Sequence, residues 1–229
     1  NRYKRVLGYF RKYWLLVVAN FFYVLGLYIH NFVFWNTDMK LVVVKTFVCN
    51  QPYDMATCLA MFTNISTTII FISRVEMYFH DKYKRYSEAV IGGKGADIDS
   101  AKREMFRQLS VELMNLVRIQ FIITTIVYLV AVVVLPHLGI SSLTMRIYPC
   151  LVAGYFILFL MYSEIVFLYY YDDLAGAGMT SIVFCLVTCL GSILATRLPE
   201  LWYGLGVVLG AFTGWTFAYF RLRYMEKHL

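Results

Sequence analysis

The chain has 229 residues, of which 60% are hydrophobic and 15% are charged, and its formal net charge is +7. Soluble domains are nearer about 45–50% apolar with about 25% charge, so one core of this size cannot bury so much apolar surface. The composition therefore excludes an ordinary water-soluble domain. The positive charge does not indicate nucleic-acid binding, because the basic residues lie between apolar runs and no zinc-finger, RNP or helix-turn-helix motif accompanies them.

Six apolar stretches have the length that a helix needs to cross a hydrocarbon core about 30 Å thick, which is about 20 residues. The third stretch is short, with 17 residues that end before Pro136, and it can take a turn from the segment before it. We predict an all-α polytopic membrane protein with six transmembrane helices in one lobe, over residues 13–35, 52–73, 119–135, 148–170, 176–195 and 201–220.

The basic residues predict the orientation of these spans. Of the 21 Lys and Arg residues, four lie in the connections of one side: Lys40, Lys45, Arg146 and Arg197. The other 17 lie before the first span, between the second and third spans, or after the sixth span. Cytoplasmic connections are the ones enriched in Lys and Arg, so both ends of this chain are predicted to be cytoplasmic.

The long connection over residues 76–118 is predicted to contain an amphipathic helix. Met105, Leu109, Leu113 and Leu116 follow helical spacing, with Glu112 and Gln120 on the same stripe. Such a helix would lie on the cytoplasmic membrane surface and lead directly into the third span. A helix packed on the protein itself is an equally good interpretation.

Polar residues inside the spans are the candidate functional residues, because ionisable groups in a membrane are costly and commonly face a cavity or a partner. Glu164 lies near the end of the fourth span and would bind a cationic or hydroxyl-rich substrate, or exchange a proton or sodium ion. The second span is polar at its centre. The predicted substrate pathway comprises Glu164, Asn64, Thr67, Thr68, Asn20, His30 and Asn31. Structural hydrogen bonds between helices are the alternative for all of them.

Charged residues at the cytoplasmic ends of the spans are candidates for a gate or a docking surface: Arg74, Glu76, Arg118, Asp172 and Asp173. They would equally anchor helix ends, and the two aspartates would cap the fifth helix or pair with the basic connection.

The sixth span carries Gly206, Gly210 and Gly214 at four-residue spacing. Small residues at this spacing let two helices approach closely. We therefore predict a helix-packing role for these glycines.

The sequence predicts neither an enzyme nor a metal or cofactor site. It contains no P-loop, HExxH or GxSxG motif. Its five cysteines are odd in number and include no Cys-x-x-Cys pair, which argues against a disulfide framework and a zinc site.

Several strings give the chain a family resemblance. They are LGLYIHNFVFW in the first span, ISRVEMYFHDKYKRY after the second, FLYYYDDLAGA at the end of the fourth, and LPELWYGLGVVLGA with FRLRYMEKHL at the end. With these strings the chain resembles, over its full length, the PelG family of inner-membrane exopolysaccharide transporters. That family is in turn similar to the polysaccharide flippases of the multidrug/oligosaccharidyl-lipid/polysaccharide exporter superfamily.

The resemblance implies one lobe of a two-lobed transporter that works by alternating access around a central cavity. The chain begins at Asn1 with a loop-like basic stretch, so we expect it to be the carboxy-terminal lobe of a longer protein. The implied cargo is a hexosamine-rich polysaccharide of the galactosamine type. The implied partners are a cytoplasmic glycosyltransferase and small membrane proteins of the Pel system. Two alternatives stay open: a membrane scaffold that recruits the glycosyltransferase, and a small-molecule antiporter of the same superfamily.

Overall fold

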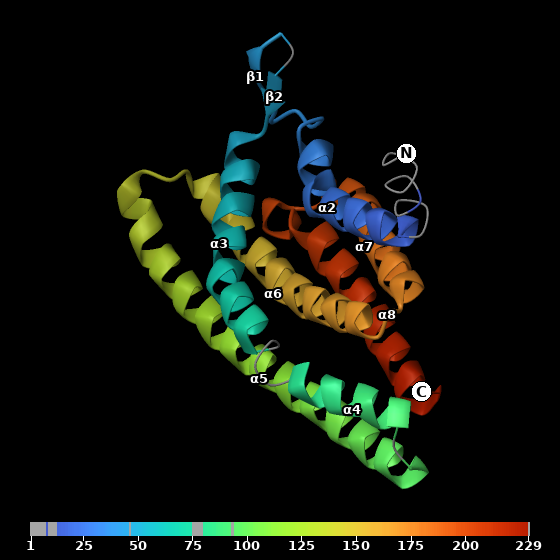
Figure 1. The fold of residues 1–229 in the computed structure, drawn as a ribbon. Helices are drawn as coiled ribbons and strands as arrows, with labels where there is room; N and C mark the ends of the chain where they lie inside the picture. Colours follow the sequence, from blue (N-terminus) through green and yellow to red (C-terminus); the bar gives the residue numbers. More distant parts are fainter. Residues whose placement is uncertain (1–7, 9–12, 46, 75–79, 93, 229) are drawn as a thin grey trace.

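The computed structural model describes residues 8, 13–45, 47–74, 80–92 and 94–228, and these residues are mostly helical (Figure 1). Six long helices dominate: α2 (Trp14–Phe34), α3 (Gln51–Arg74), α5 (Gly95–Val134), α6 (Ser142–Tyr170), α7 (Leu174–Ala195) and α8 (Leu205–His228). The smaller elements are the strands β1 (Leu41–Val44) and β2 (Phe47–Cys49), the helix α4 (His80–Gly92) and the 3-10 turns η2 (Leu135–Leu138) and η3 (Glu200–Trp202).

Five helical segments of the described chain are long and apolar enough to cross a membrane: Trp14–Phe34, Gly95–Leu138, Ser142–Tyr170, Leu174–Ala195 and Glu200–Lys227. The long helices therefore have the architecture of an all-α membrane protein. The helix α3 has 24 residues, which is enough length for a further crossing, and its place in the membrane stays a prediction.

The helix α6 lies at the centre of the molecule. It packs against α3, α5, α7 and α8, while α2 packs chiefly on α7. Five of the largest fully buried side chains belong to α6, namely Tyr148, Tyr155, Phe167, Ile147 and Leu151. The core is therefore built around one apolar helix.

Local signals in the sequence explain where the central helices begin and end. Ser141 caps α6, because its Oγ accepts the backbone N–H of Thr144 at 3.2 Å. Asp173 caps α7, because its Oδ1 accepts the backbone N–H of Gly176 at 3.1 Å. The helix α5 gives way to η2 just before Pro136, whose ring does not fit a helix interior.

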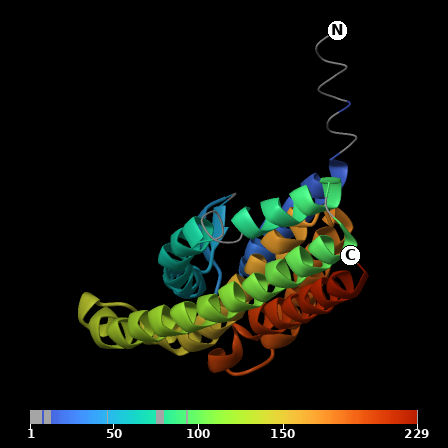
Figure 2. The same cartoon turned by 60° about the horizontal axis from the view of Figure 1, so that its bottom comes forward.

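The predicted third span is the last part of one 40-residue helix, α5, which begins well before it at Gly95. Figure 2 shows α5 along one side of the molecule, with α4 beside its first half. Lys82 of α4 pairs with Glu104 of α5 at 2.8 Å, and this hydrogen bond lowers the pKa of Glu104 below its ordinary value. The predicted stripe, from Met105 to Gln120, is largely buried against the protein.

Two features differ from the sequence prediction. The chain between α2 and α3 forms an antiparallel hairpin with Leu41 opposite Cys49 and Val42 opposite Val48, and it projects beyond the helices (Figure 1). An all-α prediction did not include it, because a run of four apolar residues is too short to register as a span. In addition, the last long helix begins at Leu205, since residues 200–202 form η3 instead.

Candidate functional site

A groove opens between α2 and α3, over the surface of α6. Its volume is about 450 Å³, and its polar and aromatic lining comes from Tyr23, Asn64, Thr68, Tyr155 and Tyr162. The groove exists because α2 packs chiefly on α7 and α3 chiefly on α6, so the two helices diverge below the hairpin (Figure 1).

Asn64 holds this groove together. Its Nδ2 donates to the backbone carbonyl of Tyr155 at 3.0 Å, and its Oδ1 accepts from Nε2 of Gln120 at 2.8 Å. Gln120 also donates to Thr124 at 2.9 Å. One amide therefore joins α3 to α6 and α5 within the apolar layer, where a hydrogen bond cannot be replaced by water. The sequence predicted Asn64 as a pathway residue and Gln120 only as part of a helical stripe, so it did not predict their pairing.

The aromatic walls of the groove are fixed by mutual packing. The rings of Tyr23 and Tyr162 lie 5.4 Å apart between centroids. Tyr155 is 1% exposed, and its hydroxyl has no hydrogen-bond partner within the described residues. The groove thus combines ring faces with a small number of amide and hydroxyl groups, which is the composition of many ligand sites.

A second polar cluster joins the end of α2 to the start of α3. The Oδ1 atom of Asp54 accepts from Nδ2 of Asn31 at 2.7 Å and from Nε1 of Trp35 at 2.9 Å. The Oδ2 atom of Asp54 accepts the backbone N–H of Asn50 at 3.0 Å. Nδ1 of His30 lies 2.9 Å from the hydroxyl oxygen of Tyr53. Asp54 was missed from the sequence, although a carboxylate in a predicted span is itself a signal.

Glu164 is a residue of α6, and it lies on the face of α6 that points away from Asn64 of α3. It is 3% exposed, and its Oε1 accepts from Nε1 of Trp215 at 3.1 Å, while Oε2 has no partner within the described residues. It lines a separate hollow of about 280 Å³ between α5, α6 and α8. The structure therefore does not bring Glu164 and Asn64 to one passage.

The remaining predicted pathway residues are dispersed. Asn20 is exposed on α2 and donates to the carbonyl of Leu16 at 2.9 Å. Thr68 donates to the carbonyl of Asn64 at 2.8 Å, within its own helix. Glu76 and the side chains of Thr67 and Arg74 lie outside the described part of the structure.

Of the predicted gate residues, Asp173 has a defined partner. Besides capping α7, it accepts from Nε and Nη2 of Arg221 at 2.6 and 3.1 Å, so it ties α7 to α8. Its neighbour Asp172 is exposed and has a left-handed backbone, with φ of 56°. Arg118 is exposed on α5 and forms no ion pair with any described residue.

The three glycines of α8 lie where helices meet. A Cβ at Gly206 would overlap Ser192 of α7, and one at Gly210 would overlap Thr188. Gly214 faces Met161 of α6. Across the described chain, no three His, Cys, Asp or Glu side chains come together as a metal site.

All of the residues 1–229 match the model of the PelG family, described as a proposed exopolysaccharide exporter (EPS-E). The chain belongs to the PelG family. Neither the curated proteins nor the solved structures contain a match to it. The family supports a transporter role, and with five membrane-length helices it indicates a multi-pass membrane protein that handles exopolysaccharide.

Proposed function

We propose that this chain forms part of the passage by which a hexosamine-rich exopolysaccharide crosses the inner membrane, by a flippase-like or channel mechanism. The groove between α2, α3 and α6 carries the proposal, since it joins aromatic faces to amide and hydroxyl groups beside helices of membrane length. The apolar C–H faces of sugar rings pack on aromatic rings, and sugar hydroxyls hydrogen-bond to amides and phenols.

The groove is open along one side of the bundle. An open groove suits a sliding polymer better than it suits a small molecule, which has to be enclosed. A few weak contacts per sugar unit hold the chain without trapping it, because conduction needs binding that is favourable but easily reversed. Tyr23, Tyr162 and Thr68 supply contacts of this kind. In this proposal both chain ends face the cytoplasm, as the distribution of Lys and Arg predicts.

The test measures exported polysaccharide in cells that carry Tyr162→Ala or Tyr162→Phe. Tyr162→Ala removes a groove wall, and loss of one aromatic contact of about 1.4 kcal/mol would slow export about tenfold. Tyr162→Phe keeps the ring and should retain most export. The control is Phe62→Ala on α3, which is 57% exposed and does not line the groove. Normal export by Tyr162→Ala at a normal protein level would contradict the proposal.

A second role, recruitment of the cytoplasmic glycosyltransferase and the small membrane proteins, is favoured by the hairpin of α4 and the first half of α5. This hairpin extends past the other helices (Figure 1), and it carries exposed basic residues such as Lys84 and Arg85. In the same cells, K84E/R85E should reduce the amount of glycosyltransferase that fractionates with the membrane, whereas Tyr162→Ala should not.

A further inference from the structure

Three adjoining hollows that share lining residues lie in a row between α5 and α8, on the opposite side of α6 from the proposed polysaccharide passage. Their volumes are about 540, 50 and 280 Å³. Ser110 lines all three, Phe106 and Glu226 join the first to the second, and Tyr219 and Arg223 join the second to the third. We call this feature the α5–α8 groove.

One end of the α5–α8 groove is basic. Lys102, Arg103 and Arg107 line it, and none of the three forms an ion pair within the described residues. The acidic residues at this end are Asp99 and Glu226, and Glu226 already accepts from Nη1 of Arg223 at 2.6 Å. Positive charge is therefore left without a partner, and it is available to an anion.

The other end of the α5–α8 groove is apolar. Leu113, Met114, Val117 and Leu160 line it, with the ring of Trp215 beside them. Glu164 closes this end, buried and held by Trp215. This apolar lining suits a hydrocarbon chain, which would cover it. A small soluble anion bound at the basic end would leave the apolar lining uncovered.

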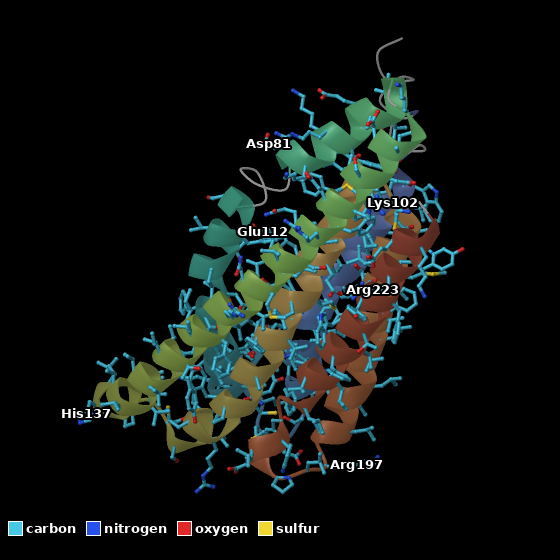
Figure 3. The ribbon with its side chains drawn as sticks, turned by 90° about the horizontal axis from the view of Figure 1, so that it is seen from below. Asp81, Lys102, Glu112, His137, Arg197 and Arg223 are labelled. Carbon is cyan, nitrogen blue, oxygen red and sulfur yellow. The ribbon has the colours of Figure 1, made fainter. Side chains whose placement is uncertain are left out.

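The length and level of the α5–α8 groove match one leaflet of a bilayer. From Lys102 to Val117 the helix rises about 22 Å, and half of a membrane with its headgroups is about 20–22 Å. The basic end lies beside Glu226, past the predicted end of the last span at residue 220, whereas the apolar end lies beside Leu160 within a predicted span. Figure 3 shows Lys102 and Arg223 at the same end of the molecule, away from His137 and Arg197.

We propose that the α5–α8 groove is a binding site for one anionic phospholipid, with the phosphate at Lys102, Arg103 and Arg107 and an acyl chain along Leu113 and Val117. A lipid fits both ends of the groove, whereas an acidic protein partner would use only the basic end. Bound there, the lipid bridges α5 to α8, which pack on α6 rather than chiefly on each other. The inference does not depend on the polysaccharide passage.

The experiment measures lipids bound to the intact protein by native mass spectrometry, after delipidation and addition of phosphatidylglycerol or phosphatidylcholine with identical chains. We expect one phosphatidylglycerol to bind in preference to phosphatidylcholine. R103Q/R107Q should weaken phosphatidylglycerol binding about tenfold or more, because two phosphate contacts are lost. Ser110→Trp, which fills the junction of the three hollows, should exclude both lipids.

The matched control is K84Q/R85Q, two exposed basic residues of α4 that do not line the groove, and it should bind phosphatidylglycerol as the original protein does. Equal binding by R103Q/R107Q, or equal loss in the control, would overturn the proposal. So would displacement of the lipid by inorganic phosphate alone, which would identify a free-anion site. Unchanged lipid binding with loss of a co-purifying protein would assign the basic end to that protein instead. Because R103Q/R107Q changes exposed residues only, its result stands even if Ser110→Trp does not fold.

Discussion

At the residue scale, a few buried polar groups decide how the helices are joined. Asp54 accepts hydrogen bonds from Asn31, Trp35 and Asn50, so it joins the end of α2 to the start of α3. Asn64 does the same between α3, α6 and α5. In an apolar layer each such group is costly unless it is paired, and its loss leaves the partner groups unsatisfied.

Replacing Asp54 by alanine tests this role. We expect Asp54→Ala to lower the free energy of unfolding by roughly 2–3 kcal/mol, because the donors of Asn31, Trp35 and Asn50 lose their acceptor. The measurement is thermal unfolding of the protein in detergent. Asp38→Ala, at an exposed carboxylate of the same connection, is the control and should melt with the unchanged protein. Identical melting of both variants would show that the Asp54 cluster contributes no stability.

The buried carboxylates belong to the same scale. Glu112 is 2% exposed and accepts from Nε2 of Gln108 at 2.8 Å, and Glu164 accepts from Trp215. Both face the interior of the bundle, as carboxylates in membrane proteins commonly do. Each carboxylate accepts a hydrogen bond from a helical side chain, and this hydrogen bond offsets part of the free-energy cost of burying the carboxylate.

At the element scale, glycines allow α7 and α8 to approach closely. Gly206 and Gly210 of α8 meet backbone as well as side chains of α7: a Cβ at Gly210 would lie 2.9 Å from the carbonyl oxygen of Phe184 and from the amide nitrogen of Thr188. Backbone atoms cannot turn aside as a flexible side chain can. The separation of these two helices is therefore set by the absence of a side chain.

Adding one methyl group at this contact should separate the helices. We expect Gly210→Ala to lower the free energy of unfolding by roughly 1–3 kcal/mol through overpacking, as a lower melting temperature in detergent. Gly178→Ala on α7 is the matched control, because its Cβ would meet no atom within 4 Å. That control should be neutral or slightly stabilising, since alanine favours a helix over glycine by about 1 kcal/mol. A Gly210→Ala protein as stable as the control would contradict close packing at this point.

At the scale of the whole molecule, charge divides the protein into two ends. The α4–α5 hairpin and the end of α8 carry most of the basic residues, whereas the β-hairpin lies at the opposite end (Figure 1) and His137 of η2 and Arg197, just before η3, lie away from Lys102 (Figure 3). The strands of the β-hairpin expose their apolar side chains, with Val43 at 56% and Phe47 at 58%. The two ends therefore offer different surfaces to the two sides of a membrane.

Single cysteines test which end faces which side. In a chain whose native cysteines are replaced by alanine, Ser87→Cys on α4 and Val43→Cys on β1 are both exposed positions. We expect a membrane-impermeant maleimide to label Val43→Cys in intact spheroplasts and Ser87→Cys only after permeabilisation, because the distribution of Lys and Arg predicts a cytoplasmic basic end. The reverse pattern would invert the predicted orientation, and labelling of both from outside would place α4 on the same side as the hairpin.

The sequence by itself determined the membrane class, the presence of several long apolar helices and the segregation of basic residues. These follow from local apolar length and from charge, which act residue by residue along one chain. It also singled out Asn64, Glu164, His30 and Asp173 as polar groups that need a partner.

Only the tertiary structure decided which of these groups meet. Asn64 and Glu164 are both polar residues in predicted spans, yet they face opposite sides of α6 and line separate hollows. Their partners Gln120 and Trp215 come from helices 51 to 56 residues away in sequence. Such pairings depend on how α3, α5 and α8 rotate and pack around α6, and apolar periodicity along one helix does not contain that information.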